Sequence, residues 1–269
     1  MKYQFGFIGT GNMGGALASA VCKRVHPQEV LLSDKTMSKA EALAESLGCT
    51  ASDSLSVAAC CRFIFLGVKP QMMKELFSEI VPVLEKREER YILVTMAAGL
   101  SMETISGFCN KEVPIIRIMP NTPVSASEGM ILYTANNFVQ EEELTAFTDA
   151  LAFAGRTDKV EESEIDAASV ISGCGPAFMF MFIKAMAEAG VSLGLKEEKA
   201  RLYAEQTMLG SAKLALSTGT DPDELKVKVC SPGGTTIEGV KSFEKNELDR
   251  IVTDAVNASY KRTLELAGK

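Results

Sequence analysis

The sequence predicts an α/β protein in which a domain built on a parallel sheet is followed by an all-helical domain. Three observations lead to this prediction. Short, almost wholly apolar segments alternate with helical patterns in the first half; each such segment ends at a glycine- or proline-containing turn; and strand signals stop after about Gly155. Apolar strands that alternate with helices are typical of a parallel sheet covered on both faces. We expect the first domain over residues 1–158 and the second over 159–269.

The expected elements of the first domain follow one another in a regular order. A helical pattern through Leu17, Ala20 and Val21 follows the first strand, and a second helix, over 39–47, ends at Gly48. The turns at 67–70, 97–99 and 120–123 each follow a strand, which places them at the carboxyl edge where open α/β sheets bind ligands. The expected strands cover 3–8, 29–32, 63–66, 91–95 and 115–119.

From residue 163 onward the chain is expected to form helices only. The breaks between these helices are expected at residues 173–176, 190–194, 219–222 and 231–234, where glycine, proline and serine gather. Asp221 followed by Pro222 has the order of a helix N-cap and a first helical residue. Residues 178–183 read Phe-Met-Phe-Met-Phe-Ile, so this helix is apolar on every side and must be buried on every side. These side chains could line a ligand pocket, but a core or a subunit interface is the favoured interpretation. A second copy of the chain is the simplest cover, because two-fold dimers are the commonest oligomers.

Composition excludes several classes of protein. The 269 residues are 46% hydrophobic and 23% charged with a formal net charge of −7, which favours a globular protein and argues against nucleic acid and anionic membranes. The longest apolar segment, 167–191, is interrupted by Lys184 and Glu188, and the amino terminus lacks the apolar region of a signal peptide. The seven cysteines form no CxxC pair. We expect free thiols, no metal site and a cytoplasmic location.

The first glycine-rich turn has the pattern of a dinucleotide fingerprint. Gly9, Gly11 and Gly14 form GxGxxG between an apolar strand and a helix, which is the context that the motif requires. The first glycine permits the tight turn, the second lets the backbone approach a pyrophosphate, and the third lets helix and strand pack closely. We therefore expect a Rossmann-type domain that binds a nicotinamide dinucleotide.

The choice between NADH and NADPH stays open at this level. Asp34 lies about 20 residues after the fingerprint, where an acidic side chain accepts a hydrogen bond from the ribose 2′-hydroxyl of NAD. Its neighbours Ser33, Lys35 and Thr36 could instead hold the 2′-phosphate of NADP, and Lys35 could equally be a solvated surface lysine.

A second glycine-rich turn, Ser231-Pro232-Gly233-Gly234-Thr235-Thr236, precedes a predicted helix. Free N–H groups, two hydroxyls and the positive end of a helix would gather there, which suits a small anion such as a carboxylate. The same residues also have the pattern of a capping box, with Thr235 as N-cap and Glu238 at the third helical position. The two interpretations are compatible, because Thr236 and the N–H groups would remain available to an anion.

The chain offers few candidates for a general acid. His26, the only histidine, is expected at the edge opposite to the ligands, and Lys69 is the leading lysine near a strand end, although it could simply face solvent. An alcohol dehydrogenase normally needs a positioned proton-transfer group. Reduction of a C=N bond asks less, because a protonated imine already carries the charge that attracts hydride.

Several segments together resemble pyrroline-5-carboxylate reductases, which catalyse the last step of proline biosynthesis. The resemblance covers essentially the whole chain and is most specific in the SPGGTT turn and the IEGVKSFE that follows it. It implies a Rossmann domain, a helical dimerisation domain that interleaves with that of a second subunit, and assembly of some members into rings of dimers. The matching segments are GFIGTGNMGGAL, LGVKPQ, RIMPNTP, SGCGPAF and SPGGTT.

The resemblance also implies roles for individual residues. The phosphate-binding turn, the adenosine-ribose contact and the lining toward the nicotinamide would be formed by Gly9, Gly11, Asn12, Met13, Gly14, Ser33, Asp34, Lys35, Val68, Lys69, Pro70, Ala97, Ala98 and Gly99. The pyrroline-5-carboxylate substrate would be framed by Asn121 and Pro123 and held through its carboxylate by Ser231, Gly233, Gly234, Thr235 and Thr236. Thr235 or Thr236 would present the hydroxyl nearest the imine nitrogen. The implied cofactor is NADPH or NADH.

The chain departs from the family pattern at a few positions. Cys174 and Phe178 stand where a serine and a tyrosine are common, and Lys184 where a glutamate is common, while Glu188 keeps an acidic side chain nearby. Asp34 is less suited to NADP than the small polar residue often found there, so use of NADH stays open.

Three other functions compete with the imine reductase. A β-hydroxyacid dehydrogenase would need a catalytic lysine at about 174–177, where there is none. A non-catalytic NADP sensor would keep the first glycine turn but have no use for the second. A purely structural dimer would need neither turn.

Overall fold

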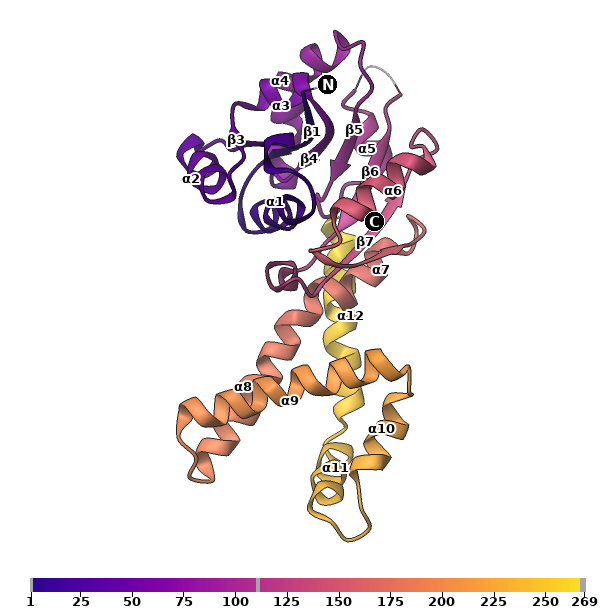
Figure 1. The fold of residues 1–269 in the computed structure, drawn as a ribbon. Helices are drawn as coiled ribbons and strands as arrows, with labels where there is room; N and C mark the ends of the chain where they lie inside the picture. The colour runs from indigo at the N-terminus through magenta and orange to yellow at the C-terminus, as the bar shows by residue number, and fades with distance from the viewer. Residues whose placement is uncertain (1, 110–111, 267–269) are drawn as a thin grey trace. The chain divides into compact units, whose positions relative to one another are not determined.

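The computed structural model describes residues 2–109 and 112–266, and the described strands form one eight-stranded sheet (Figure 1). The strand order is β3-β2-β1-β4-β5-β6-β7-β8. The chain runs outward from β1 to β3, returns to the other side of β1 and continues outward from β4. The direction therefore reverses between β1 and β4, and such a switch point opens a crevice at the carboxyl edge. The strands are β1 (Tyr3–Ile8), β2 (Val30–Ser33), β3 (Thr50–Ala51), β4 (Cys61–Leu66), β5 (Ile92–Thr95), β6 (Ile115–Met119), β7 (Gly129–Ala135) and β8 (Gly155–Lys159).

The expected strands of the first half are confirmed, but the sheet is not wholly parallel, and it continues past Gly155 to Lys159. β7 pairs antiparallel to β6, and β8 then pairs parallel to β7. Only a short connection that contains η3 (Thr122–Ala126) joins β6 to β7, which is too little chain for a parallel crossover. β8, Gly-Arg-Thr-Asp-Lys, carries no apolar signal because it is a polar edge strand.

Two apolar layers cover the faces of the sheet. On one face Phe7 and Phe65, from neighbouring strands, stack with ring centroids 4.5 Å apart, and α1, α2 and α6 pack over them. On the other face Ile64 and Leu66 are fully buried beneath α3, α4 and α5. The helices of this half are α1 (Asn12–Arg24), α2 (Met37–Leu47), α3 (Ser54–Cys60), α4 (Met73–Glu85), α5 (Met102–Ser106), α6 (Glu141–Ala150) and α7 (Ile165–Ser169).

Contacts divide the chain into two compact units, one of residues 1–173 with 260–269 and one of residues 174–259. The second unit is helical, and its breaks near Gly194, Gly219 and Gly233 are confirmed, since each of these glycines has a positive φ. Asp221 is confirmed as the N-cap of α10, since its side chain accepts from Asp223 N. The helices that form this half are α8 (Gly175–Ser192), α9 (Glu197–Thr218), α10 (Pro222–Val229), α11 (Thr235–Lys245) and α12 (Leu248–Leu266), the last of which ends in the first unit.

The break expected at 173–176 is wrong. Residues Val170–Cys174 instead form a π-helical turn, η4, that continues from α7 into α8. Pro176 follows in the first turn of α8, where the missing N–H of proline is tolerated. The glycine and proline signals therefore mark a change in helix type rather than an interruption.

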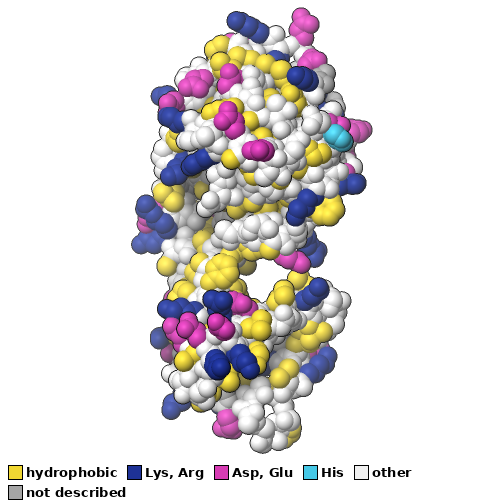
Figure 2. Space-filling view, turned by 60° about the vertical axis from the view of Figure 1, so that its left-hand side comes forward, with side chains coloured by type: hydrophobic (Ala, Val, Ile, Leu, Met, Phe, Trp, Pro, Cys, Tyr) yellow, Lys and Arg dark blue, Asp and Glu magenta, His cyan; other side chains and the backbone are white. Residues whose placement is uncertain are grey.

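The helical unit leaves much apolar surface exposed in the single chain, and hydrophobic side chains are visible there in Figure 2. Phe180 and Met181 are 61% and 71% exposed. The continuous stretch Ile165–Ser192 is long and apolar enough to cross a membrane by length and composition alone, which is weak evidence for a membrane helix. All seven cysteines are free, as expected.

Candidate functional site

The first glycine-rich turn has the geometry expected of a phosphate-binding turn. Gly9, directly after β1, has a φ of +98° that only glycine adopts readily. A side chain on Gly14 would collide with the Gly9 carbonyl oxygen. A Cβ atom on Gly11, by contrast, would have no other atom within 4 Å, so the space beside Gly11 is open. Gly11 is also the N-cap of α1, and no side chain caps this helix end. The first N–H groups of α1 are therefore available to an anion that approaches Gly11.

The carboxylate of Asp34 joins this turn to the end of β2. One oxygen, Oδ2, accepts from Thr10 N at 2.8 Å and lies 3.2 Å from Thr10 Oγ1, while Oδ1 accepts from Thr36 N at 2.9 Å. The neighbouring Ser33 is buried, and its hydroxyl lies 3.1 Å from the hydroxyl of Ser54. The sequence predicts the position of Asp34 beside the turn but not these backbone partners.

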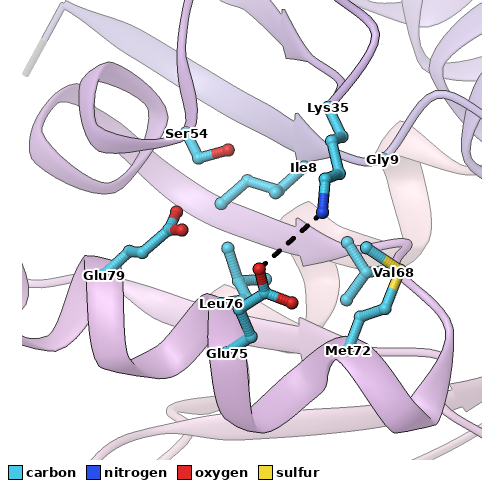
Figure 3. Close-up of a pocket in the computed structure, with 9 residues that line it drawn as sticks. All are labelled: Ile8, Gly9, Lys35, Ser54, Val68, Met72, Glu75, Leu76 and Glu79. Carbon is cyan, nitrogen blue, oxygen red and sulfur yellow. Dashed lines mark ion pairs between the residues drawn. The ribbon is translucent and has the colours of Figure 1, made fainter.

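A cavity of about 130 Å³ opens beside the turn (Figure 3). Across it the ammonium group of Lys35 lies 3.7 Å from the carboxylate of Glu75, and Glu79 presents a second carboxylate nearby. The cavity brings together Gly9, Lys35 and Val68 of the predicted cofactor set with residues of α4 that sequence analysis did not single out. It is lined by Ile8, Gly9, Lys35, Ser54, Val68, Met72, Glu75, Leu76 and Glu79.

The other predicted cofactor residues of this unit follow β4 and β5 at the same edge of the sheet. Lys69 is exposed and precedes the short helix η2 (Pro70–Met72), and its ammonium group takes part in no ion pair among the described residues. Ala97 is buried, and Gly99 has a φ of +76°. The parallel pairing of β4 with β1 places the turn after β4 next to the glycine-rich turn, and the pairing of β5 with β4 places the turn after β5 one strand further along the same edge.

The side chain of Asn121 holds its own loop in place. Its Nδ2 donates to the carbonyl of Ser172 in the π-helical turn at 2.9 Å, and its Oδ1 accepts from Met130 N at 2.9 Å. Both ends of the amide are thus engaged within the protein. Pro123 lies in η3 and is half-buried.

A buried ion-pair network, which sequence analysis missed, lies near this loop. Arg117 on β6 donates to Asp166 of α7 at 2.9 Å, and it lies 3.6 Å from Glu162. Glu162 in turn accepts from the first N–H of α5, at Met102. The available signal was a single arginine within the apolar strand Ile-Ile-Arg-Ile-Met.

The second glycine-rich turn differs from the expected capping box. Gly234, not Thr235, is the N-cap of α11, with φ −79° and ψ 170° and no side-chain cap, and Glu238 pairs with Lys241 at 2.7 Å. The helix begins one residue earlier because Gly234 adopts the extended conformation required of an N-cap. The Gly234 N–H donates a hydrogen bond to the carbonyl oxygen of Ser231 at 3.0 Å.

The consequence is that both threonines lie in the first turn of α11. Among the described residues, neither the Thr235 nor the Thr236 hydroxyl makes a hydrogen bond. Two hydroxyls and the first N–H groups of an eleven-residue helix therefore remain available to an anion. His26, by contrast, caps the short helix η1 (Pro27–Glu29), and its Nδ1 accepts from Gln28 N. No cluster of three metal-ligating side chains occurs in the described part of the chain.

Two family models match the chain. Residues 4–99 match "NADP oxidoreductase coenzyme F420-dependent", and residues 162–266 match "Pyrroline-5-carboxylate reductase dimerisation". The pyrroline-5-carboxylate reductase of Escherichia coli is 35% identical over 270 residues, which cover 99% of each chain.

Solved structures give the same result. A pyrroline-5-carboxylate reductase from Coxiella burnetii matches with a TM-score of 0.90 and 30% identity over 99% of both chains. The Plasmodium falciparum enzyme, solved with NADP bound, matches with a TM-score of 0.87 and 28% identity over 99% of both chains. With this likeness over its whole length, the chain belongs to the pyrroline-5-carboxylate reductase family.

Proposed function

We propose that this chain reduces 1-pyrroline-5-carboxylate to L-proline with NADPH or NADH as the hydride donor. The observation that carries the proposal is the likeness to pyrroline-5-carboxylate reductases over 99% of the chain, which includes both glycine-rich turns. Each turn leads into a helix whose first N–H groups have no side-chain cap. The start of α1 suits a pyrophosphate, and the start of α11 suits a carboxylate.

The residues of the first turn suit a dinucleotide. Gly9 and Gly14 leave no room for a side chain, Gly11 leaves space for a ligand, and the first N–H groups of α1 provide the donors. Asn12 and Met13 contribute N–H groups of this first turn. When bound, the cofactor supplies the hydride that C5 of the imine accepts. The residues that would line the bound cofactor toward its nicotinamide are Val68, Lys69, Pro70, Ala97, Ala98 and Gly99.

The residues of the second turn suit the substrate. The carboxylate of pyrroline-5-carboxylate is held by N–H and hydroxyl groups of Ser231, Gly233, Thr235 and Thr236. Gly234, whose N–H donates to Ser231 O, shapes the turn against the substrate, and Asn121 and Pro123 frame the ring. A hydroxyl of Thr235 or Thr236 lies beside the imine nitrogen, which is protonated before hydride arrives and leaves the reaction as the secondary amine. Catalysis then depends mostly on positioning and on exclusion of water.

The organisation of the protein is part of the proposal. Residues 1–158 bind the cofactor, and residues 159–269 form the substrate and dimerisation domain of a cytoplasmic homodimer that can associate into a ring of dimers. The dimerisation model covers 162–266, which contain the apolar stretch Ile165–Ser192. Lys184 and Glu188 interrupt that stretch, so burial against a second copy explains it better than a bilayer.

The test is a spectrophotometric assay with pyrroline-5-carboxylate, run separately with NADPH and with NADH. Oxidation of either cofactor with formation of L-proline supports the proposal. A sensor would bind cofactor without oxidising it, a β-hydroxyacid dehydrogenase would instead oxidise a hydroxy acid, and a structural dimer would bind neither ligand. Absence of oxidation with both cofactors would reject the proposed reaction.

A further inference from the structure

The end of β2 carries a negative charge that is held firmly in place. Asp34 accepts from two backbone N–H groups, those of Thr10 at 2.8 Å and Thr36 at 2.9 Å, and these belong to two different loops. Both loops adjoin the place where the adenosine ribose of a dinucleotide lies in this type of fold. The carboxylate therefore remains beside that ribose and does not rotate freely away from it.

These two N–H groups are also the donors that a bound anion would seek. Backbone N–H groups exposed at turns are common donors to bound phosphates. Here the Asp34 carboxylate occupies them, in the manner of an internal anion. A cofactor phosphate at this place would have to displace the carboxylate or lie against it, whereas an unsubstituted ribose 2′-hydroxyl can donate to it.

The neighbouring cavity does not compensate for this charge. Lys35 is the only basic residue among those that line it, and its ammonium group lies 3.7 Å from Glu75. Glu79 adds a second carboxylate to the same lining (Figure 3). Two carboxylates thus oppose one ammonium group, before Asp34 is counted, and a phosphate monoester would add about two more negative charges at pH 7.

We propose that this chain selects NADH over NADPH, and that Asp34 determines the selection by keeping its carboxylate at the end of β2. The inference rests on the proposed function only in that the ligand is a nicotinamide dinucleotide. Glu75 reinforces the selection by drawing Lys35 away from the ribose. An exposed pair of this kind is weak, so its contribution is smaller than that of Asp34.

The decisive experiment measures binding of NADH and NADPH to the full chain by titration calorimetry, without pyrroline-5-carboxylate. We expect the wild-type protein to bind NADH about tenfold more tightly or better, because repulsion between one carboxylate and an added phosphate about 4 Å away reaches that order even at the dielectric constant of water. Asp34→Asn keeps the size of the side chain and one acceptor oxygen but removes the charge. It should shift the ratio of the two dissociation constants about tenfold toward NADPH.

Two further variants separate charge from structure. Glu45→Gln removes an exposed charge from α2 and should leave the ratio unchanged. Glu75→Gln leaves the Asp34 hydrogen bonds intact and releases Lys35, so it should raise NADPH binding a few-fold, less than Asp34→Asn does. It also keeps the proposal testable if the Asp34 variant does not fold.

The inference is overturned if the wild-type protein binds NADPH as tightly as NADH. It is also overturned if Asp34→Asn weakens both cofactors equally, because Asp34 would then only brace the loops, or if Glu75→Gln leaves NADPH binding unchanged. Binding is measured without substrate, so a chain that selects NADH but does not reduce pyrroline-5-carboxylate would reject the proposed function and leave this inference standing.

Discussion

The sheet half of this chain buries an ion pair and its apolar side chains, whereas the helical half leaves both its ion pairs and much apolar surface exposed. In the sheet half the side chains of Arg117 and Asp166 pair while only 4% and 5% exposed. In the helical half the pair of Lys241 with Glu238 is 60% and 68% exposed, and α8, α10, α11 and α12 contain no buried residue among those described. The sheet half completes its core within one chain, whereas the helical half has the composition of a core and lacks a cover.

The largest effect is expected on the apolar surface of the helical half that we propose a second copy covers. Phe180→Glu should convert the proposed dimer to monomers, because a buried aromatic side chain contributes about 1.5–3 kcal/mol and a two-fold interface would contain it twice. Sedimentation velocity would report the change in mass. The matched control is Phe138→Glu, which alters an aromatic residue 43% exposed on the sheet half. An unchanged dimer in the Phe180 variant would place the interface elsewhere.

The next largest effect is expected inside the sheet half. Arg117→Met removes the guanidinium partner of a buried carboxylate and should lower the free energy of unfolding by about 3–5 kcal/mol. Urea denaturation measures it. Lys241→Met, which breaks the exposed pair of Lys241 with Glu238, should cost no more than about 0.5 kcal/mol. Equal losses in the two variants would show that the two halves do not differ in the way described.

These features also show how far sequence reasoning reaches. The strands at 3–8, 63–66 and 115–119 were predictable because they are buried on both faces and therefore apolar throughout. β8 was not, because a polar edge strand resembles a loop in composition. β7 runs antiparallel to β6 because the connection between them is short. The length of that connection is known only once β7 itself has been identified in the sequence.

The site divides in the same manner. The GxGxxG turn was predictable because glycine identity and position carry the geometry. The start of α11 was placed one residue too late, since the motif suits a cap on either Gly234 or Thr235. The backbone partners of Asp34 and the ion pair of Arg117 depend on tertiary contacts between residues far apart in the sequence, so no local pattern could reveal them.

A smaller effect, specific to binding, is expected at the second glycine turn. Thr236→Val keeps the shape of the side chain but removes a hydroxyl from the first turn of α11. We expect a loss of about 1.5–3 kcal/mol in substrate binding, as for one hydrogen bond to a charged group, with cofactor binding unchanged. Steady-state kinetics with both cofactors would measure it, with Thr218→Val, at the far end of α9, as the control. Unchanged KM and kcat would argue against a role for this hydroxyl.

The last comparison uses acid pH to separate a buried carboxylate from an exposed one. Burial alone would raise the pKa of Glu143, but hydrogen bonds from Arg90 and from the Gln140 N–H hold that pKa below its usual range. Because the folded-state pKa lies below the unfolded value, its stabilisation is complete above the ordinary glutamate pKa of about 4.3 and is lost as pH falls through the folded-state value.

Glu143→Gln should therefore destabilise the protein by about 1.5–3 kcal/mol at pH 7, and the difference from wild type should shrink on acidification. Glu238→Gln should change the free energy of unfolding by less than about 0.5 kcal/mol at either pH, because its partner Lys241 is exposed to water. Chemical denaturation from pH 7 down to about pH 2, which takes the titration below the lowered folded-state pKa of Glu143, measures both differences. A Glu143 variant whose deficit stays constant over that range would mean that Gln fails by shape, not by charge, and that the buried carboxylate contributes no pH dependence to the sheet half.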